Sequence, residues 1–171
     1  MSVIKIKKIA KRIFFIFSIL LLSPFILLVR LGKGEFFNIF ANGISIFPGM
    51  IGSYLRVAFY FCTCKKISPD IFIGFGSYFS RREVEVGMNS SIGAYCIIGS
   101  VNIGREVLIA SRVSIPSGRH QHGTAEDGHA KWEKMEVDMI SIGDKSWIGE
   151  GALILADVGE KLYCGRGKCS R

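Results

Sequence analysis

The chain has 171 residues, of which 49% are hydrophobic, and this is enough for one domain with a substantial core. A formal net charge of +8 could suggest a nucleic-acid partner, but the cations gather at the two ends of the chain and charge is mixed between them. This distribution argues against nucleic-acid binding. The terminal cations are Lys5, Lys7, Lys8, Lys11 and Arg12 at one end and Lys161, Arg166, Lys168 and Arg171 at the other.

The five cysteines include no pair with metal-ligand spacing. A disulfide framework is expected in short secreted domains, and nothing in this chain points to that class. We therefore expect reduced cysteines in a compartment that faces the cytosol. The cysteines are Cys62, Cys64, Cys96, Cys164 and Cys169.

An uncharged apolar stretch, IFFIFSILLLSPFILLV, runs from residue 13 to 29 and has about the minimum length of a membrane-crossing helix. A cleaved signal peptide is the rival interpretation because basic residues precede the stretch, but no small-x-small cleavage site follows it. We expect the stretch to be retained and to associate with a membrane. The excess of cations before it places the N-terminus in the cytoplasm.

A simple crossing does not explain the residues that follow. Pro24 interrupts the helical hydrogen-bond ladder, and a second apolar stretch with glycine and proline interruptions occupies residues 36–61. A re-entrant hairpin or a pair of interfacial helices, which returns the chain to the cytosolic side, is one interpretation. The other is that residues 13–62 form a buried helical subdomain. We interpret residues 1–66 as a membrane-associated helical region.

From about residue 73 onward, aliphatic residues recur at six-residue steps in three runs, and a five-residue step from Ile98 to Ile103 joins the first two runs. A small residue follows most of them. This period differs from the 3.6 of a helix and favours three short strands per turn, with each aliphatic side chain inward and a tight corner after it. Stacked coils of about 18 residues then bury a column of isoleucine and valine. An ordinary β-sandwich would instead show turn clusters every 8 to 12 residues. The pattern comprises Ile73-Gly74, Val86-Gly87, Ile92-Gly93, Ile98-Gly99, Ile103-Gly104, Ile109-Ala110, Ile115-Pro116, Ile142-Gly143, Ile148-Gly149 and Ile154-Leu155.

The pattern assigns residues 67–159 to one β-helical domain, and residues 116–139 interrupt it as a loop. A loop of this length in a regular repeat is usually functional. It contains every histidine in the chain, namely His120, His122 and His129.

The segments VNIGREVLIASRVSIPSGRHQH (101–122) and ISIGDKSWIGEGALIL (140–155) resemble the hexapeptide-repeat acyltransferases. The likeness is greatest to sugar O-acetyltransferases related to galactoside and maltose acetyltransferase, and it covers residues 71–158. The segment PGMIGSYLRVAFY (48–60) is similar to the polysaccharide-modifying branch. The resemblance implies a left-handed parallel β-helix, acetyl-CoA as acyl donor, and a homotrimer with each active site between two subunits.

The resemblance also implies a general base. In the family a histidine stands five residues after the inward aliphatic residue that precedes the loop, and five residues after Ile115 is His120. A sugar hydroxyl is too weakly acidic to attack a thioester at neutral pH without a base of matching pKa. His120 is therefore expected to be catalytic and His122 to contact the substrate or the loop. The alternative, that both are ordinary loop histidines, stays open.

The CoA-binding residues expected from the resemblance lie just after the loop. Trp147 corresponds to an aromatic residue beside the pantetheine arm, and the segment from Gly149 through Glu150 and Gly151 to Ala152 would line the CoA groove. Relatives often have a small residue where Glu150 stands. The asparagine and aspartate that hold the acceptor in galactoside acetyltransferases have no clear counterparts, so the acceptor is not carried over.

No metal site is expected, because the metal-binding relatives of this fold take their ligands from well-separated turns and not from one loop. Since acetyl-CoA is cytosolic, the resemblance favours the cytoplasmic face of the membrane. The acceptor would be a cell-surface polysaccharide or its precursor. A non-catalytic membrane scaffold is the main alternative function, and a serine acetyltransferase is a weaker one, because its helical N-terminal domain is missing.

Residues 160–171, which include KLYCGRGKCSR, show no six-residue pattern. One interpretation is a frameshift, because suitable codons for this segment read as an on-register hexapeptide coil once a single adenine is omitted. Such a product would lack its last coil and have weak or no activity. The other interpretation is a natural short terminus with a basic tail.

Overall fold

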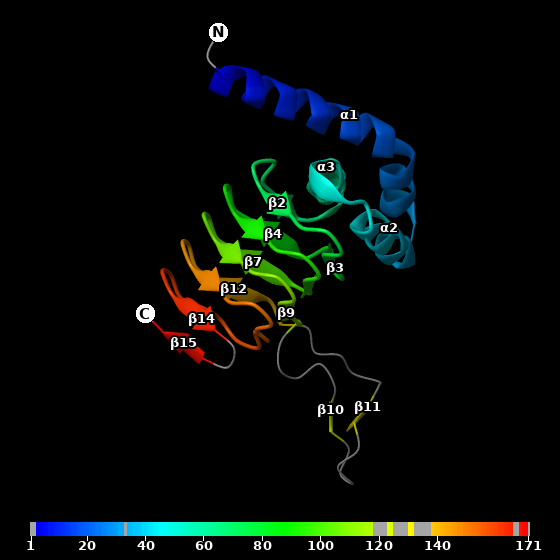
Figure 1. Ribbon diagram of the computed structural model, residues 1–171. Coiled ribbons are helices and arrows are strands. Elements are labelled where there is room, and N and C mark those ends of the chain that lie inside the picture. The colour runs from blue at the N-terminus through cyan, green and yellow to red at the C-terminus, as the bar shows by residue number, and fades with distance from the viewer. Residues whose placement is uncertain are drawn as a thin grey trace.

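The computed structural model describes residues 3–32, 34–117, 123–124, 130–131, 138–165 and 168–170. Three helices precede a stack of coils, and the chain ends at the opposite end of that stack (Figure 1). The helices are α1 (Val3–Leu31), α2 (Glu35–Ser45) and α3 (Gly49–Thr63). Within α1, the segment Ile9–Leu31 is long and apolar enough to cross a membrane, with a mean hydropathy of 2.5.

The coils form a three-sided parallel β-helix, as the six-residue pattern predicted. The first side contains β1 (Lys66–Ile67), β4 (Val84–Val86), β7 (Val101–Ile103) and β12 (Ile140–Ile142). The second contains β2 (Phe72–Ile73), β5 (Ser91–Ile92), β8 (Leu108–Ile109), β13 (Trp147–Ile148) and β14 (Tyr163–Gly165). The third contains β3 (Tyr78–Phe79), β6 (Ile97–Ile98) and β9 (Ser114–Ile115), and a bridge from Ser114 to Leu153 extends it.

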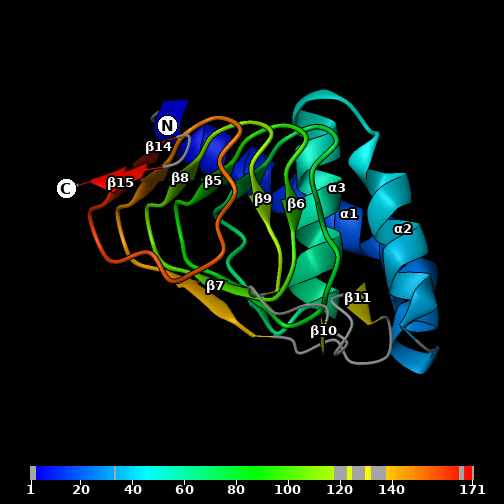
Figure 2. The same cartoon turned by 90° about the horizontal axis from the view of Figure 1, so that it is seen from below.

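We number the coils by their residues: the first is 66–79, the second 84–98, the third 101–115, the fourth 140–154 and the fifth 158–165. Figure 2 shows the same stack from below, with the helices at one end and the fifth coil at the other. The inward aliphatic residues of successive coils are aligned, as in the register Ile92↔Ile109. Their side chains are almost completely buried and form one continuous core.

The sequence analysis ascribed the small residue after each inward aliphatic residue to a tight corner, but the close packing of successive coils is the reason. The backbone of the next coil lies directly against this residue. A Cβ atom added to Gly93 would stand 2.6 Å from the carbonyl carbon of Ala110. The bend of the chain itself falls later, at residues such as Asn89 and Lys145, which adopt left-handed backbone conformations.

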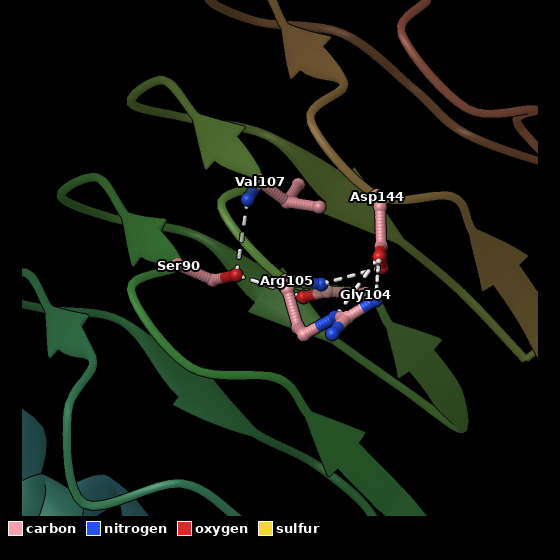
Figure 3. Close-up of polar contacts among 5 residues, drawn as sticks. All are labelled: Ser90, Gly104, Arg105, Val107 and Asp144. Atoms are coloured by element: carbon pink, nitrogen blue, oxygen red, sulfur yellow. Dashed lines mark hydrogen bonds and ion pairs between the residues drawn. The ribbon is translucent and has the colours of Figure 1, made fainter.

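Buried serine side chains hold neighbouring coils together. The Ser90 hydroxyl donates to the Gly104 carbonyl at 2.8 Å and accepts from the Val107 N–H at 3.0 Å (Figure 3). Ser77 and Ser146 make the same two bonds to the coils that follow them. Each hydroxyl therefore satisfies one donor and one acceptor of the next coil.

Helix α3 closes the N-terminal end of the β-helix through polar side chains on one of its faces. Ser53 accepts a hydrogen bond from the Ile73 N–H at 3.2 Å, and Tyr60 accepts one from the Phe79 N–H at 3.1 Å. Arg56 donates to the Ile73 carbonyl at 3.1 Å. The first coil has no coil before it, so its outer backbone groups would lack partners. The side chains of α3 satisfy these groups. This cap explains the segment 48–60, which the sequence analysis had assigned only by resemblance.

The Arg56 guanidinium is completely buried and also binds the C-terminal end of α2. It donates to the carbonyls of Ile44, Ser45 and Phe47 at 3.3, 3.1 and 2.8 Å. Burial lowers its pKa from the ordinary value. A cation suits this position because the C-terminus of a helix carries partial negative charge. One side chain thus joins α2, α3 and the first coil.

The C-terminal end differs from the prediction. We expected residues 160–171 to leave the β-helix, but β14 pairs in parallel with β13 and places Cys164 over Ile148. Cys164 is buried and stands six residues after the inward Val158, so a small sulfur side chain continues the pattern that we had traced with isoleucine and valine. The frameshift stays a hypothesis about the gene.

The expectation of reduced cysteines is wrong for one of them. Cys164 is disulfide-bonded, whereas Cys62, Cys64 and Cys96 are free. The physical reason lies in the last two strands, because β15 (Lys168–Ser170) turns back antiparallel on β14 and brings Cys169 opposite Cys164.

We predict that Ser90→Ala lowers the free energy of unfolding by about 2 kcal/mol, because it leaves a buried donor and a buried acceptor unpaired. Urea denaturation followed by circular dichroism measures the change. Ser91→Ala is the matched control, since Ser91 is only half-buried on the outer side of β5. Equal effects of the two substitutions would contradict the assigned role of Ser90.

Arg56→Met should cost roughly 3 kcal/mol of unfolding free energy, because several buried carbonyls lose their donor. The exposed Arg12→Met is the control of equal charge change. Hydrogen exchange of the first-coil amides, including Ile73, should also accelerate in the Arg56 variant. Protection that stays unchanged there would show that α3 does not close the stack through this side chain.

Candidate active site

The loop that contains the histidines leaves and rejoins the β-helix between the third and fourth coils. Its two ends meet, because the Asp138 N–H donates to the Ser117 carbonyl at 3.1 Å. Ser117 is buried, and its hydroxyl accepts from the Ser100 N–H at 2.9 Å, which anchors the start of the loop to the connection between the second and third coils. Within the loop, β10 (Gly123–Thr124) pairs antiparallel with β11 (Ala130–Lys131).

The expected base His120 and the expected substrate contact His122 lie outside the described residues, as does His129. The structure therefore fixes where their loop begins and ends. It does not test their roles.

An arginine–aspartate pair ties the third coil to the fourth at the corner between the first and second sides. The Arg105 backbone N–H donates to Asp144 Oδ1 at 2.8 Å, and its Nε donates to Oδ2 at 3.0 Å (Figure 3). These hydrogen bonds, from the backbone first and then from the side chain, hold the pKa of Asp144 below its ordinary value. Gly104 leaves room for the carboxylate, since a Cβ there would collide with it.

A second ion pair ties the same two coils at the next corner, where Arg112 contacts Glu150. The backbone supports this corner as well, because the Gly151 N–H donates to the Ser111 carbonyl at 3.0 Å. Two of the three corners at this junction are therefore held by ion pairs, and the loop emerges at the third. This arrangement keeps the coils in register across the insertion.

Trp147 is the only aromatic residue among the expected CoA-binding residues, and it lies at the surface. It is the outward residue of β13 and is 44% exposed. Its neighbours on the outer surface are Leu108 of the third coil and Tyr163 of the fifth, whose ring lies edge-on at 6.0 Å. Together they form an exposed apolar stripe across the junction, which can accept an aliphatic or aromatic ligand.

The other four expected residues divide between surface and interior. Glu150 and Gly151 are exposed, and Gly151 has a left-handed backbone with φ of 69°. Gly149 is buried, and Ala152 is only 2% exposed. The Glu150 carboxylate is paired with Arg112, so this side chain links the fourth coil to the third.

Sequence reasoning missed Arg105, Arg112 and Asp144. A usable signal exists, because Arg105 and Asp144 stand directly after an inward aliphatic residue and the small residue that follows it, and Arg112 stands one residue further on at its own corner. Charged residues of opposite sign at matching corners of adjacent coils predict such pairs. Among the described residues, no group of three or more histidine, cysteine, aspartate or glutamate side chains could hold a metal ion.

Two solved structures are similar to the chain. A hexapeptide-repeat acetyltransferase from Vibrio cholerae matches with a TM-score of 0.54 at 16% identity, over 82% of this chain and 92% of that one. The acetyltransferase domain of PglB from Neisseria gonorrhoeae, in complex with acetyl coenzyme A, matches with a TM-score of 0.29 at 20% identity, over 60% of this chain and 52% of that one. The second likeness is too weak to support an argument. No protein-family model and no curated sequence matches.

The first likeness shows the fold. The chain is a left-handed parallel β-helix, the fold of the hexapeptide-repeat acetyltransferases, with an apolar helical region at its N-terminus. The fold class expected from the sequence is confirmed. The chemistry still has to be argued from the residues at the junction.

We predict that Asp144→Asn lowers the thermal midpoint at pH 7 and that this difference from the parent chain disappears in strong acid. The pKa of Asp144 is depressed in the folded state, so its stabilisation is present above the ordinary aspartate pKa and is lost as the pH falls through the folded value. Thermal melts from pH 7 down to about 2 measure it. The exposed Glu106→Gln serves as control, and a constant deficit of Asp144→Asn at every pH would contradict the ion pair.

Proposed function

We propose that the protein is an O-acetyltransferase that moves an acetyl group from acetyl-CoA to a sugar hydroxyl of a cell-surface polysaccharide or its precursor. One observation carries the proposal. The only histidine-containing segment of the chain is inserted at a coil junction that two ion pairs hold in register, and Trp147 is exposed on the second side of the fourth coil, which does not border the corner where this segment leaves. The fold shared with the Vibrio cholerae acetyltransferase supports the same class of reaction.

His120 acts as the general base in this proposal. It removes the proton from the sugar hydroxyl as that oxygen attacks the acetyl carbonyl carbon of the thioester. The carbon–sulfur bond then breaks, and the imidazolium returns the proton to the CoA thiolate. The acetyl group passes directly from the CoA sulfur to the hydroxyl oxygen, so no acyl-enzyme forms. His122, two residues further on, contacts the acceptor.

The CoA arm lies along the fourth coil in this proposal. The Trp147 ring provides an apolar surface for the pantetheine, and the chain from Gly149 through Glu150 and Gly151 to Ala152 borders the groove. Gly149 and Ala152 are buried and small, so they contribute by leaving the groove free of projecting side chains. Gly151 and the Glu150 backbone form the rim of the groove. A metal ion has no part in this chemistry.

A homotrimer completes the site. The stripe of Leu108, Trp147 and Tyr163 is exposed on the single chain, and a second β-helix placed beside it would form the other wall of the groove. We place the trimer at the cytoplasmic face of the membrane, where acetyl-CoA and lipid-borne glycan precursors are both accessible. The apolar N-terminal region, with residues 13–29 at its centre, supports this location.

His120→Ala should lower the turnover of acetyl transfer about 100-fold or more, the usual contribution of general-base catalysis. The measurement is CoA release from acetyl-CoA with membrane-derived glycan acceptors, resolved into kcat and KM. The loss should fall on kcat. His129→Ala, a substitution in the same loop, is the matched control and should retain activity.

Equal activity of the two histidine variants would remove His120 from the mechanism. Absence of transfer by the parent chain with every glycan acceptor, despite a folded trimer, would favour a non-catalytic scaffold. Transfer to free serine in preference to glycans would instead indicate a serine acetyltransferase.

A further inference from the structure

Helix α1 presents a stripe of large apolar side chains to its surroundings, with Ser23 and Pro24 at the turn between Leu20 and Leu27. The stripe follows helical spacing, and its members are between 56% and 79% exposed. Monomeric soluble proteins rarely expose a contiguous apolar surface of this extent. The stripe comprises Ile13, Ile16, Leu20, Leu27 and Leu31.

The opposite side of α1 accounts for its packing within the protein. Leu22, Ile26 and Val29 are buried there, and the Phe15 ring meets the Phe61 ring of α3 edge-on at 5.3 Å. The packing of α1 within the protein therefore leaves the stripe unburied. Only a partner outside the chain could remove this apolar surface from water.

The same apolar surface continues onto the residues around α2. Ile39, Ile46 and Ile51 are each more than 60% exposed. Between α1 and α2 lies an apolar hollow of about 390 Å³, whose lining includes Leu21, Phe25, Phe40 and Phe47. Water in this hollow would find almost no hydrogen-bonding partner, whereas an acyl chain would fill it.

Both ends of α1 are bonded to the same part of the protein. Near its start, Lys11 Nζ binds Asp70 Oδ1 of the first coil at 2.9 Å. At its end, the Arg30 guanidinium donates to the Cys62 carbonyl of α3 at 2.9 and 3.2 Å. Cys62 and Asp70 are close in sequence, and the exposed Lys65 and Lys66 lie between them.

These bonds argue against a crossing orientation. If α1 spanned a bilayer, its ends would lie about 30 Å apart on opposite sides, and the segment from Cys62 to Asp70 would have to cross the hydrocarbon with its charges. An orientation parallel to the bilayer plane avoids this cost. The apolar stripe can then enter the lipid while the β-helix stays in water (Figure 1).

We infer that α1, α2 and α3 form an in-plane seat on an anionic phospholipid bilayer, with the N-terminus and the β-helix on the same side. The positive charge of the residues beside and before the stripe favours an anionic lipid. Arg12 and Arg30 are exposed beside the stripe, and Lys5, Lys7 and Lys8 precede it in the sequence. Such cations bind anionic headgroups while the apolar residues enter the acyl boundary. The inference rests on the proposed membrane location but not on the proposed acyl transfer.

Vesicle binding by the full chain tests the seat. With vesicles of phosphatidylglycerol and phosphatidylcholine, the parent chain should co-sediment, and binding should weaken with salt and in pure phosphatidylcholine. The double variant Ile13→Glu, Leu20→Glu should bind roughly ten-fold or more weakly, because it places charges in the apolar boundary. Met88→Glu, which changes an exposed apolar residue of the β-helix, should bind like the parent.

Labelling in sealed vesicles tests the orientation. Cysteines introduced separately as Ser2→Cys and Lys145→Cys should both react with a membrane-impermeant maleimide from the same side, above the background of the unchanged chain. Reaction from opposite sides would show that α1 spans the bilayer and would overturn the inference. So would self-association through the stripe without vesicle binding.

A soluble acceptor separates this inference from the proposed function. If the double variant loses vesicle binding but still transfers acetyl to a soluble glycan, the seat and the chemistry are independent. If the parent binds vesicles but transfers nothing, the seat stands and the proposed reaction fails.

Discussion

A stack of parallel coils leaves unpaired backbone groups at each end, and the rest of this structure depends on how the first end is closed. Helix α3 supplies hydrogen-bonding side chains to the first coil, and the buried Arg56 links that cap to the end of α2. Because α3 is fixed in this way, α1 can pack across it and turn its apolar stripe outward. The closure of the β-helix and the outward presentation of the apolar stripe therefore share one cause.

The second constraint is register across the insertion. A long loop between two coils removes the short connection that normally aligns them. The pairs Arg105–Asp144 and Arg112–Glu150 compensate for this at two corners, and the bond between Asp138 and Ser117 closes the loop base at the third. The segment that holds the histidines is thus attached to a rigid frame, which is the arrangement that positioned catalysis requires.

The repeating part of the fold was predictable, and the reasons are local. Inward residues such as Ile92 and Ile148 recur at a fixed interval, so the period alone defines three sides and one core. The continuation through Cys164 was missed because a cysteine replaces the aliphatic residue that the pattern requires. The cap was missed because Ser53, Arg56 and Tyr60 bond to backbone atoms, which carry no sequence signal. The pairing of Glu150 with the Arg112 side chain of the preceding coil was missed because the two residues are 38 positions apart in the sequence.

The central claim is that the junction of the third and fourth coils is an acyl-CoA site. A crystal structure of the chain with bound CoA tests it most directly. The account predicts that the pantetheine arm lies against Trp147 and that the thiol ends beside the loop at residues 116–139 of a neighbouring subunit. CoA on another side of the β-helix, with Trp147 uncovered, would contradict it.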